Sequence, residues 1–556
     1  MTESKIFKPR VTLSSITFSS GNKIELDDNE KIILVGPNNS GKSQSLREIV
    51  TICQSGNASQ SIVIKALKLK KHGTSKDLRL YLEKNAELIQ NQFRISDYVI
   101  HEPHVQHWDM SPYLINGLHV GSIKNIAANE RLSICNQQNS ISPGQQKSKP
   151  QHLMYDDEDL MEKVSLLFKK AFSKDLMFDF RGGSKLPIHV GSIPKVEGVV
   201  DRVGNDYVLK VRENPLLDLQ GDGIRSYAGI LFETVVSERD MTLIDEPEAF
   251  LHPPQMRRLG ETLSSEVKGQ LIVATHSSDI LRGFLEGTKG NVRILRIRRE
   301  GDANFVHEAS PQTIKELWEK PELRYSNALE GIFHEQTIIC EDDSDCRLIN
   351  SIADHLNVNN ENSFKDTAYV PTGGKHGIPK VASVLKKIGV PIRAIFDIDF
   401  LSERDLVKKT VEAFEGDWVE IETLWNRVDS DVRGGIKPQS AEVIKTEMIS
   451  LLQNAEGKDL PKKEIMELMK RGKAWNEIKK YGEIAIPKGQ CQNDYKILKD
   501  KLEKIGIFVV PVGEIENFCP EIGLHGPKFV TKLLTEVPLD DPSLEQLRQF
   551  VSHTHK

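Results

Sequence analysis

Residues 36–43 read Gly-Pro-Asn-Asn-Ser-Gly-Lys-Ser, and this stretch decides how the first part of the chain folds. Two glycines separated by four residues and followed by Lys and Ser are typical of a phosphate-binding loop. The glycines let successive backbone N–H groups turn toward a phosphate chain. Lys42 adds a positive charge, and Ser43 offers a hydroxyl to Mg²⁺. The pattern therefore predicts that the chain binds a nucleoside triphosphate together with Mg²⁺.

The residues on either side of this loop fit the prediction. Lys31–Val35 reads as a short apolar strand, and a helix is expected from Ser43 to about Cys53. The N-terminus of such a helix favours anions. A chance glycine-rich turn would not explain why strand, loop and helix occur in this order. We expect the nucleotide to be bound by Gly36, Pro37, Asn38, Asn39, Ser40, Gly41, Lys42, Ser43 and Gln44.

Size and composition limit the class of protein. A chain of 556 residues predicts several domains. The formal net charge of −6 gives no overall basic surface, so nucleic-acid binding would need local patches. The six cysteines have no metal-ligand spacing, and the first residues show no signal-peptide pattern. No apolar run reaches the roughly 18–20 residues that span a bilayer. We therefore expect a reduced, cytoplasmic protein with no membrane partner.

Two further strands carry polar residues at their C-terminal ends. Met241–Ile244 is apolar and is followed by Asp245 and Glu246. In a triphosphatase, the first carboxylate would hold Mg²⁺ and the second would orient and deprotonate the attacking water. The strand Leu271–Thr275 delivers His276 to the edge of the sheet where ligands of α/β proteins bind. We expect this histidine to sense the γ-phosphate.

Gly221 and Gly223 open a further helix, whose N-terminus can offer N–H groups to an anion. The alternative is an ordinary glycine-rich turn before a helix. Because the loop at 36–43 already serves one nucleotide, a second anion site suggests an active site shared between two copies of the chain.

Periodicity and turn residues predict the domain organisation. The first domain is expected over 1–310, with an insertion or helical lobe over about 55–215, and a connector over 311–335. A second α/β domain is expected over 336–556, with a helical insertion over about 402–504. Smaller elements are expected as helices at 75–89, 156–173 and 226–237, several strands between 177 and 211, and a last strand at 507–512.

The motifs of the first domain resemble the soluble branch of the ATP-binding-cassette (ABC) superfamily, which includes RecF, the SMC heads and OLD-type ATPases. The resemblance covers residues 10 to about 310. It implies a head-to-head homodimer, or a higher oligomer, with ATP between one subunit's Walker A loop and the other's signature motif. The signature reads Gln-Gly-Asp-Gly instead of Ser-Gly-Gly-Gln, which leaves the rate of hydrolysis open. The implied assignments are Walker A at Gly36–Ser43, signature at Gly221 and Gly223, Walker B at Asp245 and Glu246, and switch histidine at His276.

The second domain places carboxylates after two apolar strands. Thr337–Cys340 is followed by Glu341, and Arg393–Phe396 is followed by Asp397 and Asp399. In a strand–helix–strand–helix–strand order, parallel strands bring such ends together on one rim. Clustered carboxylates repel one another unless a cation neutralises them, and Mg²⁺ prefers oxygen ligands. The sequence therefore predicts a Mg²⁺ site that could activate water at a phosphodiester.

This pattern resembles the Toprim domain of topoisomerases, primases and OLD-family nucleases. That family has a Glu on the first strand, matched by Glu341, and an Asp-x-Asp on a later strand, matched by Asp397 and Asp399. Asp345 matches a further acid that often follows the first Glu. Asp342 stands where the family usually has Gly, which leaves open whether the domain is an active nuclease or a platform without chemistry.

Three other residues of this domain have alternative roles. Glu516, or Glu514, follows another strand and would complete an OLD-like acidic cluster; a solvated strand end is the alternative. Lys375 is either a phosphate contact or an exposed lysine.

An ABC head fused to a Toprim-like domain resembles OLD proteins and the Gabija nuclease. The ATPases of Septu and Septu-like retron systems are similar cassettes that act beside a separate HNH nuclease. The resemblance implies prokaryotic defence against phage, with ATP and Mg²⁺ as cofactors. One hypothesis is an enzyme that cleaves DNA or RNA under nucleotide control. A second is a regulatory ATPase that silences a partner HNH nuclease or a retron reverse transcriptase–ncRNA complex. A third, a RecF- or SMC-type repair ATPase, has no long coiled coil to support it.

Overall fold

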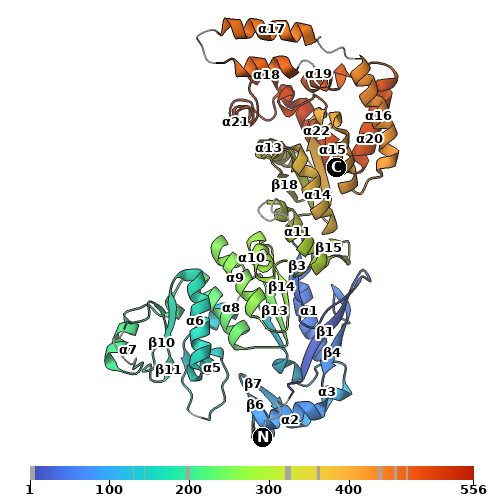
Figure 1. Cartoon of the computed structure of the whole chain (residues 1–556). Coiled ribbons are helices and arrows are strands. Elements are labelled where there is room, and N and C mark those ends of the chain that lie inside the picture. The colour runs from blue at the N-terminus through green and yellow to red at the C-terminus, as the bar shows by residue number, and fades with distance from the viewer. Residues whose placement is uncertain are drawn as a thin grey trace. The chain divides into compact units, whose positions relative to one another are not determined.

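The structure is a computed structural model that describes residues 7–128, 130–142, 144–195, 201–319, 327–359, 364–435, 441–455, 460–470 and 474–556. The chain divides into two compact units, Met1–Pro321 and Glu322–Lys556 (Figure 1). The division falls inside the segment expected as a connector over 311–335. Each unit has its own sheet and is described by itself below.

The main sheet of the first unit is mostly parallel and has the order β16–β15–β3–β14–β13–β8. Neighbouring strands run parallel, except that β15 and β16 form an antiparallel hairpin. The strands β3, β14 and β13 therefore end at one edge, which is where ligands bind in such sheets. The bounds are β3 Lys31–Val35, β8 Ile123–Ile126, β13 Met241–Asp245, β14 Gln270–Ala274, β15 Arg293–Glu300 and β16 Ala303–Ala309.

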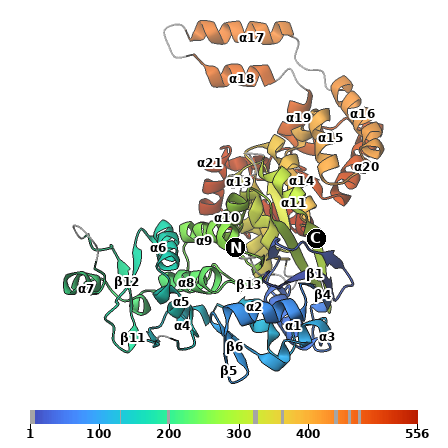
Figure 2. The ribbon, with the colours of Figure 1, turned by 60° about the horizontal axis from the view of Figure 1, so that its bottom comes forward.

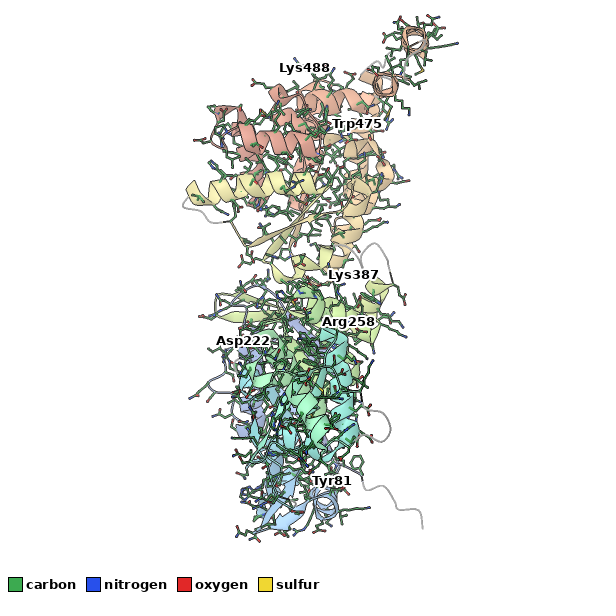
Figure 3. The ribbon with its side chains drawn as sticks, turned by 90° about the vertical axis from the view of Figure 1, so that its left-hand side faces the viewer. Tyr81, Asp222, Arg258, Lys387, Trp475 and Lys488 are labelled. Atoms are coloured by element: carbon green, nitrogen blue, oxygen red, sulfur yellow. The ribbon has the colours of Figure 1, made fainter. Side chains whose placement is uncertain are left out.

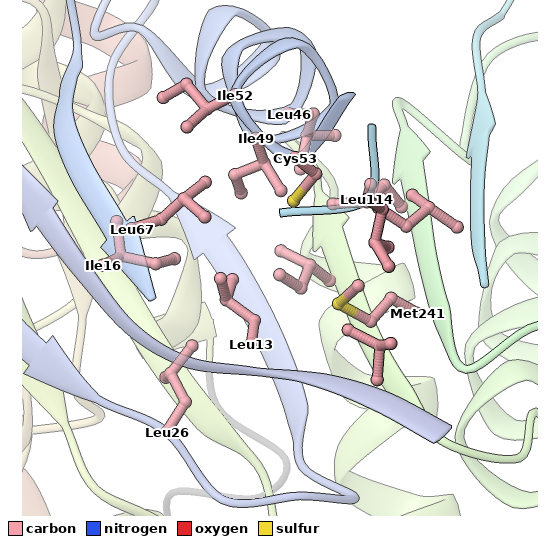
Figure 4. Packing of buried hydrophobic residues seen from close by; sticks show 14 of the residues in the cluster. Leu13, Ile16, Leu26, Leu46, Ile49, Ile52, Cys53, Leu67, Leu114 and Met241 are labelled. Carbon is pink, nitrogen blue, oxygen red and sulfur yellow. The ribbon is translucent and has the colours of Figure 1, made fainter. Parts of the chain in front are cut away.

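A second, antiparallel sheet of order β2–β1–β4 belongs to the same core. Its strands are β1 Arg10–Phe18, β2 Lys23–Glu25 and β4 Ile64–His72. The helix after the phosphate loop is α1, Lys42–Ser55. Figure 4 shows how Leu13 of β1, Ile49 of α1 and Met241 of β13 share one buried cluster. Burying each such side chain contributes roughly 1.5–3 kcal/mol, so the loop is held on a firmly packed base.

The residues expected as one lobe over 55–215 are divided by the structure. Because β4 and β8 belong to the core sheets, the inserted residues form separate groups around them. The first group contains α2 Ser75–Asn85, α3 His107–Met110, and a sheet of β5 Glu87–Ile89, β6 Gln92–Ile95 and β7 Tyr98–His101. The second contains α4 Glu130–Ser133, α5 Pro150–Asp156, α6 Glu158–Phe172, α7 Asn205–Arg212, β9 Gln138–Asn139, β10 Asp175–Phe178, β11 Lys185–Leu186 and β12 Ile188–Gly191.

Four local predictions were wrong in part. The helix expected over 75–89 ends at Asn85, and β5 follows it. The stretch 177–211 was expected to hold several strands, but its last part belongs to the helix α7 Asn205–Arg212, because the buried Tyr207, Val208 and Val211 lie on one helical face. The helix expected over 226–237 begins earlier, as α8 Asp222–Leu231, and continues as a π-helical turn, η4 Phe232–Val236. The last strand ends at Val509 instead of 512.

The remaining helices of the first unit are α9 Pro253–Glu266, α10 Ser278–Thr288 and α11 Pro311–Trp318. The first two pack closely through glycines. A Cβ atom added to Gly283 of α10 would lie 2.1 Å from the carbonyl oxygen of Arg257 in α9. No larger residue fits there without moving one helix.

The second unit is built on a parallel sheet of order β18–β17–β19–β20. The bounds are β17 Gln336–Cys340, β18 Thr367–Pro371, β19 Ile392–Phe396 and β20 Ile507–Val509. Its described α-helices are α13 Asp343–Asn359, α14 Ile378–Lys387, α15 Arg404–Ala413, α16 Trp418–Gly435, α17 Ala441–Asn454, α18 Lys462–Lys470, α19 Ala474–Tyr481, α20 Gln490–Lys504, α21 Pro527–Glu536 and α22 Glu545–His555. Figure 2 shows α17 and α18 lying beside each other. Within the described residues, no helix combines the length and apolar character of a bilayer span.

Candidate nucleotide and metal sites

The phosphate loop joins β3 to α1, and both of its glycines are required by the backbone. Gly36 has φ 138° and Gly41 has φ 100°, a region that side chains with a Cβ rarely adopt. A Cβ on Gly36 would also lie 2.2 Å from the carbonyl oxygen of Ile297 in β15. The loop is thus wedged against the neighbouring strand, and substitution at either glycine would displace it.

Lys42 is buried inside this loop. Its Nζ donates hydrogen bonds to the carbonyl oxygens of Gly36 at 2.9 Å and Pro37 at 2.8 Å. Burial lowers the pKa of Lys42 to about 8, and the nearby carboxylates of Glu246, Glu248 and Asp245 oppose that shift. An incoming phosphate would offer this ammonium group a stronger partner than the carbonyls it now contacts.

The residues of the second motif meet the loop directly. Ser43 Oγ donates a hydrogen bond of 2.8 Å to Asp245 Oδ1. Burial raises the pKa of Asp245, while this hydrogen bond lowers it. The hydroxyl and the carboxylate therefore lie together in the arrangement that would hold Mg²⁺ beside a triphosphate.

A cleft of about 490 Å³ opens over the loop. This volume is in the range of small-ligand sites. Its lining includes residues that the sequence did not single out, among them Asn304 of β16, whose Nδ2 donates a 2.7 Å hydrogen bond to the carbonyl oxygen of Ser40. The lining residues are Asn38–Gln44, Arg47, Ile62, Val63, Glu246, His276, Arg299 and Asn304.

His276 lies at the end of β14, on this cleft. Burial, and then the charge of Lys42, lower the pKa of His276 to about 4, so its imidazole is neutral at pH 7. Its backbone N–H donates a 2.6 Å hydrogen bond to Glu248 Oε1, and Thr275 Oγ1 donates one of 2.8 Å to Glu248 Oε2. Glu248 was not predicted from the sequence, although it is the next acid after the Asp-Glu pair.

Gly221 and Gly223 are placed at the start of α8. Gly221 precedes the helix and is exposed, as is Asp222 (Figure 3). A Cβ on Gly223 would lie 2.6 Å from the carbonyl oxygen of Phe250. Within the described residues, the lining of the cleft over 38–44 includes neither glycine. Their role as a signature motif that acts on a second copy stays a prediction.

The structure gathers the acidic residues of the second unit at one rim of its sheet. Glu341 follows β17 and Asp397 follows β19, and these two strands are parallel neighbours. The backbone N–H of Asp397 donates a hydrogen bond of 3.4 Å to Glu341 Oε1. Lys479 contacts both Asp397 and Asp399. The sequence-predicted carboxylates therefore face one small volume.

Crowding and burial disturb the pKa values of this rim. Burial, and then the charges of Asp397 and Asp399, raise the pKa of Glu341 to about 7. Burial, and then Asp342, raise the pKa of Asp345 to about 8, and burial raises that of Asp397 to about 6. The rim therefore retains protons near neutral pH. An all-oxygen donor set of this kind suits Mg²⁺ or Mn²⁺, which would displace those protons.

Two lysines partly neutralise the acidic rim. Lys479 of α19 donates a 2.8 Å hydrogen bond to Asp397 Oδ2 and a 3.3 Å hydrogen bond to Asp399 Oδ1. Lys375 donates one of 3.0 Å to Asp399 Oδ2 and pairs with Glu403 at 2.8 Å. Although burial opposes it, the two lysines lower the pKa of Asp399. Lys375 is thus ion-paired and half-buried. It is not the exposed lysine that was one of the two interpretations of the sequence.

Asp342, the departure from the family's glycine, has a structural role. Its Oδ1 accepts hydrogen bonds from the backbone N–H groups of Ser344 at 2.8 Å and Asp345 at 3.1 Å. An aspartate that accepts such bonds caps the start of a helix, here α13. The cap also fixes Asp345 in the first turn, next to the rim.

A further acidic group lies after β20, on the same side of the sheet. Carboxylate atoms of Glu514 and Glu516 and a ring nitrogen of His525 all lie within 4.8 Å of one another. Lys479 Nζ lies 3.8 Å from Glu514 Oε2, which joins this group to the rim. Glu516 is already engaged, because its Oε1 accepts a 2.7 Å hydrogen bond from the backbone N–H of Gly526.

Comparisons with known families agree with this order of domains. The family model described as "AAA domain, putative AbiEii toxin, Type IV TA system" matches residues 210–282. The model described as "Overcoming lysogenization defect protein-like, TOPRIM domain" matches residues 332–399. The chain therefore carries an ATPase domain followed by an OLD-like TOPRIM domain, and its fold is α/β.

Two curated relatives match parts of the chain. The Old nuclease of Escherichia phage P2 is 27% identical over 189 residues, which are 32% of this chain and 31% of that nuclease. The match thus spans about a third of the nuclease's length. An uncharacterized protein of Methanocaldococcus jannaschii is 29% identical over 107 residues, 18% of this chain and 92% of that protein.

Solved SMC head structures also match. An SMC head bound to the C-winged helix domain of ScpA has 11% identity and a TM-score of 0.33, and covers 54% of this chain and 98% of its own. The SMC head domain from Thermotoga maritima has 12% identity and a TM-score of 0.30, with 55% and 100% covered.

Proposed function

We propose that this protein is an ATP-hydrolysing nuclease of prokaryotic anti-phage defence, in which the nucleotide state controls metal-dependent cleavage of DNA or RNA. One observation carries the proposal: Glu341, Asp397 and Asp399 lie on one sheet rim with raised pKa values at the first two. Acids that are buried and forced together in this way are typical of catalytic or metal sites. The OLD-like TOPRIM match supports the same reading.

The ATP site is proposed from the residues around the cleft. The loop Gly36–Gln44 would hold the phosphates, Ser43 and Asp245 would hold Mg²⁺, and Glu246 would deprotonate the attacking water. The neutral imidazole of His276 would contact the γ-phosphate. Gly221 and Gly223 of a second copy would close the site.

The TOPRIM site is proposed to bind one or two divalent ions. Glu341, Asp345, Asp397 and Asp399 would be ligands, and Glu516 would complete the set. Bound metal would supply a hydroxide nucleophile and stabilise the leaving oxygen of a phosphodiester. The protein's own part is to hold the carboxylates in register at the strand ends and to keep Lys375 and Lys479 beside them as counter-charges.

Replacing Glu246 tests the proposed dimer. Glu246→Gln removes the general base but keeps the size of the side chain, so ATP should bind without being hydrolysed. We expect this variant to accumulate as an ATP-bound dimer, measured by light scattering with and without ATP. The wild-type chain with ADP is the control, and a monomer under all conditions would contradict the proposed assembly.

Plasmid nicking tests the cleavage itself. Purified protein with Mn²⁺ or Mg²⁺ should nick a supercoiled plasmid or cut RNA. Asp399→Asn should lower the rate by about 100-fold or more, because loss of even an outer-shell partner of a metal ligand costs about 10- to 100-fold. Asp405→Asn, an exposed acid of α15, is the matched control. If neither metal nor any nucleotide produces cleavage, the nuclease proposal fails.

A second candidate function is favoured by the lysines at the acidic rim. Because Lys479 and Lys375 contact Asp397 and Asp399, the rim is partly neutralised without a metal. A platform of this kind could hold a separate HNH nuclease, or a retron reverse transcriptase–ncRNA complex, silent until infection. Absence of cleavage, together with co-purification of the product of a neighbouring gene, would select this candidate.

A further inference from the structure

Arg131 of α4 is a buried cation beneath the turn that follows β13. Only 1% of its surface is exposed. Its Nη2 donates a 2.7 Å hydrogen bond to the carbonyl oxygen of Glu246, and its Nη1 donates one of 3.4 Å to that of Asp245. Burying a charge is unfavourable unless it is compensated, and the Nε of Arg131 finds no partner among the described residues. A buried group of this kind requires a specific explanation.

The turn that Arg131 supports is strained. Glu246 has φ 46°, a left-handed conformation that is uncommon for residues with a Cβ. Its N–H donates to the carbonyl oxygen of Ala274 at 2.9 Å, and its own carbonyl oxygen accepts from Arg131. The backbone of Glu246 is thus fixed on both sides, while its carboxylate lines the nucleotide cleft. Strain of this kind persists only where neighbouring groups hold it in place.

Glu248 holds the same turn from the other side. Its two carboxylate oxygens accept hydrogen bonds from the His276 backbone N–H and the Thr275 hydroxyl, at the end of β14. This carboxylate is also a charge partner of Arg131. Arg131 and Glu248 therefore hold the backbones of Glu246 and His276 in fixed relative positions. Arg131 itself is absent from the cleft lining among the described residues.

Arg131 packs against α8, the helix that Gly221 precedes and that contains Gly223. A Cβ on Gly229 of α8 would lie 2.2 Å from the carbonyl oxygen of Arg131. Arg225 of α8 donates a 3.0 Å hydrogen bond to the carbonyl oxygen of Leu132 in α4. A displacement of α8 would therefore move Arg131 and, through it, the carbonyls of the turn.

We propose that Arg131 and Glu248 are positioning residues for ATP hydrolysis, which hold the carboxylate of Glu246 and the ring of His276 in register and transmit the position of α8 to them. Neither residue binds the nucleotide in this account. Their loss should therefore slow the chemical step and leave binding nearly intact, because small misplacements of reacting groups cost large factors in rate.

Arg131→Lys is the first test, since it keeps the charge but loses the planar pair of donors. We expect the kcat of ATP hydrolysis to fall by about 10- to 100-fold, while the Kd for a fluorescent ATP analogue changes less than about threefold. Arg239→Lys is the matched control. Arg239 is a buried arginine before the opposite end of β13, where it donates to the carbonyl oxygen of Val120 and pairs with Asp97. Arg239→Lys should lower the melting temperature without lowering kcat.

Glu248→Gln provides a second arm if Arg131→Lys does not fold. The amide keeps the size of the side chain but has one acceptor oxygen, so either the His276 N–H or the Thr275 hydroxyl loses its partner. The same fall in kcat at nearly constant Kd is expected.

Gly229→Ala tests the link to α8, because it displaces α4 without altering either side chain, and it should also lower kcat. The proposal is overturned if these variants keep kcat within about twofold of the Arg239→Lys control, or if Kd weakens in proportion to kcat.

Discussion

Lys42 is buried and Lys479 is half-buried, and the partners of their ammonium groups differ. Lys42 donates to loop carbonyls, and burial lowers its pKa to about 8. Lys479 donates to carboxylates, which raise its pKa despite burial. A nearby anion stabilises the charged form of an ammonium group, whereas burial disfavours it. The first lysine is therefore ready to accept a phosphate, and the second already neutralises two acids.

Lys42→Ala tests the nucleotide site at the scale of one residue. Loss of the charge-assisted contacts to the phosphates should weaken ATP binding by about 100-fold or more. The measurement is equilibrium titration with a fluorescent ATP analogue. Lys31→Ala is unsuitable as a control because Lys31 anchors β3 through the carbonyls of Val267 and Gly269; the exposed Lys65→Ala is suitable. Unchanged affinity in Lys42→Ala would refute the assignment.

Lys479→Met tests the acidic rim. Removal of the cation leaves Asp397 and Asp399 less compensated, so a divalent ion should bind more tightly at neutral pH, by about tenfold. Calorimetric titration with Mn²⁺ measures the change. Lys480→Met, at the exposed neighbouring position of α19, should leave the affinity as it is. Equal affinities in wild type and Lys479→Met would show that the rim does not take up the metal.

Residues in ordered motifs could be predicted from the sequence, whereas their supporting residues could not. Glu341, Asp397 and Asp399 follow apolar strands, and parallel strands bring their ends together. Lys479 comes from a helix 80 residues after Asp399 and has no motif of its own. Arg131 could not be predicted either, because its contacts are to backbone carbonyls that any residue could supply.

At the scale of elements, helix starts account for much of the local geometry. The cap formed by Asp342 explains why the family's glycine is dispensable here: a helix N-terminus accepts a capping carboxylate as well as a glycine. The departure therefore does not by itself indicate lost chemistry. The helix Asn205–Arg212, at the end of a stretch expected to hold strands, has a different cause. Val and Tyr are compatible with both structures, and burial on one face decides for the helix.

His555 at the end of α22 should make the second unit sensitive to acid. Its Nδ1 donates to the Val551 carbonyl oxygen at 2.7 Å, so its Nε2 accepts from the Tyr369 hydroxyl at 2.8 Å. Burial lowers the pKa of His555 below its usual value near 6.5. As the pH falls below 6.5, the unfolded chain takes up this proton first. The free energy of unfolding should then fall by up to about 1.4 kcal/mol per pH unit, until the pH reaches the lowered pKa of His555 in the folded state.

The measurement is thermal unfolding of the full chain between pH 7.5 and 5.5. We expect the melting temperature of His555→Gln to fall less over this range than that of the wild type. His553→Gln is the control on the same helix, because His553 is exposed and pairs with Glu503. If both variants respond to pH as the wild type does, His555 is not the titrating group.

At the scale of the whole molecule, two units with different chemistry share one chain. The order of an ATPase domain and an OLD-like TOPRIM domain could be predicted, because each carries strand-end motifs that are short and ordered. The exact extent of the inserted segments could not, since β4 and β8 return to the core sheets from within a region without clear periodicity. Residues 320–326 of the expected connector, and residues 436–440, 456–459 and 471–473 of the helical insertion, lie outside the described residues.

The central claim is that nucleotide held by the first unit controls cleavage by the second. The most direct measurement is the rate of Mn²⁺-dependent plasmid nicking by Glu246→Gln, with and without ATP, beside Lys42→Ala under the same conditions. We predict that ATP changes the rate of Glu246→Gln by about tenfold or more, a coupling of ordinary size, and leaves Lys42→Ala unaffected. Equal rates with and without ATP in Glu246→Gln, at a site that Asp399→Asn still abolishes, would contradict the account.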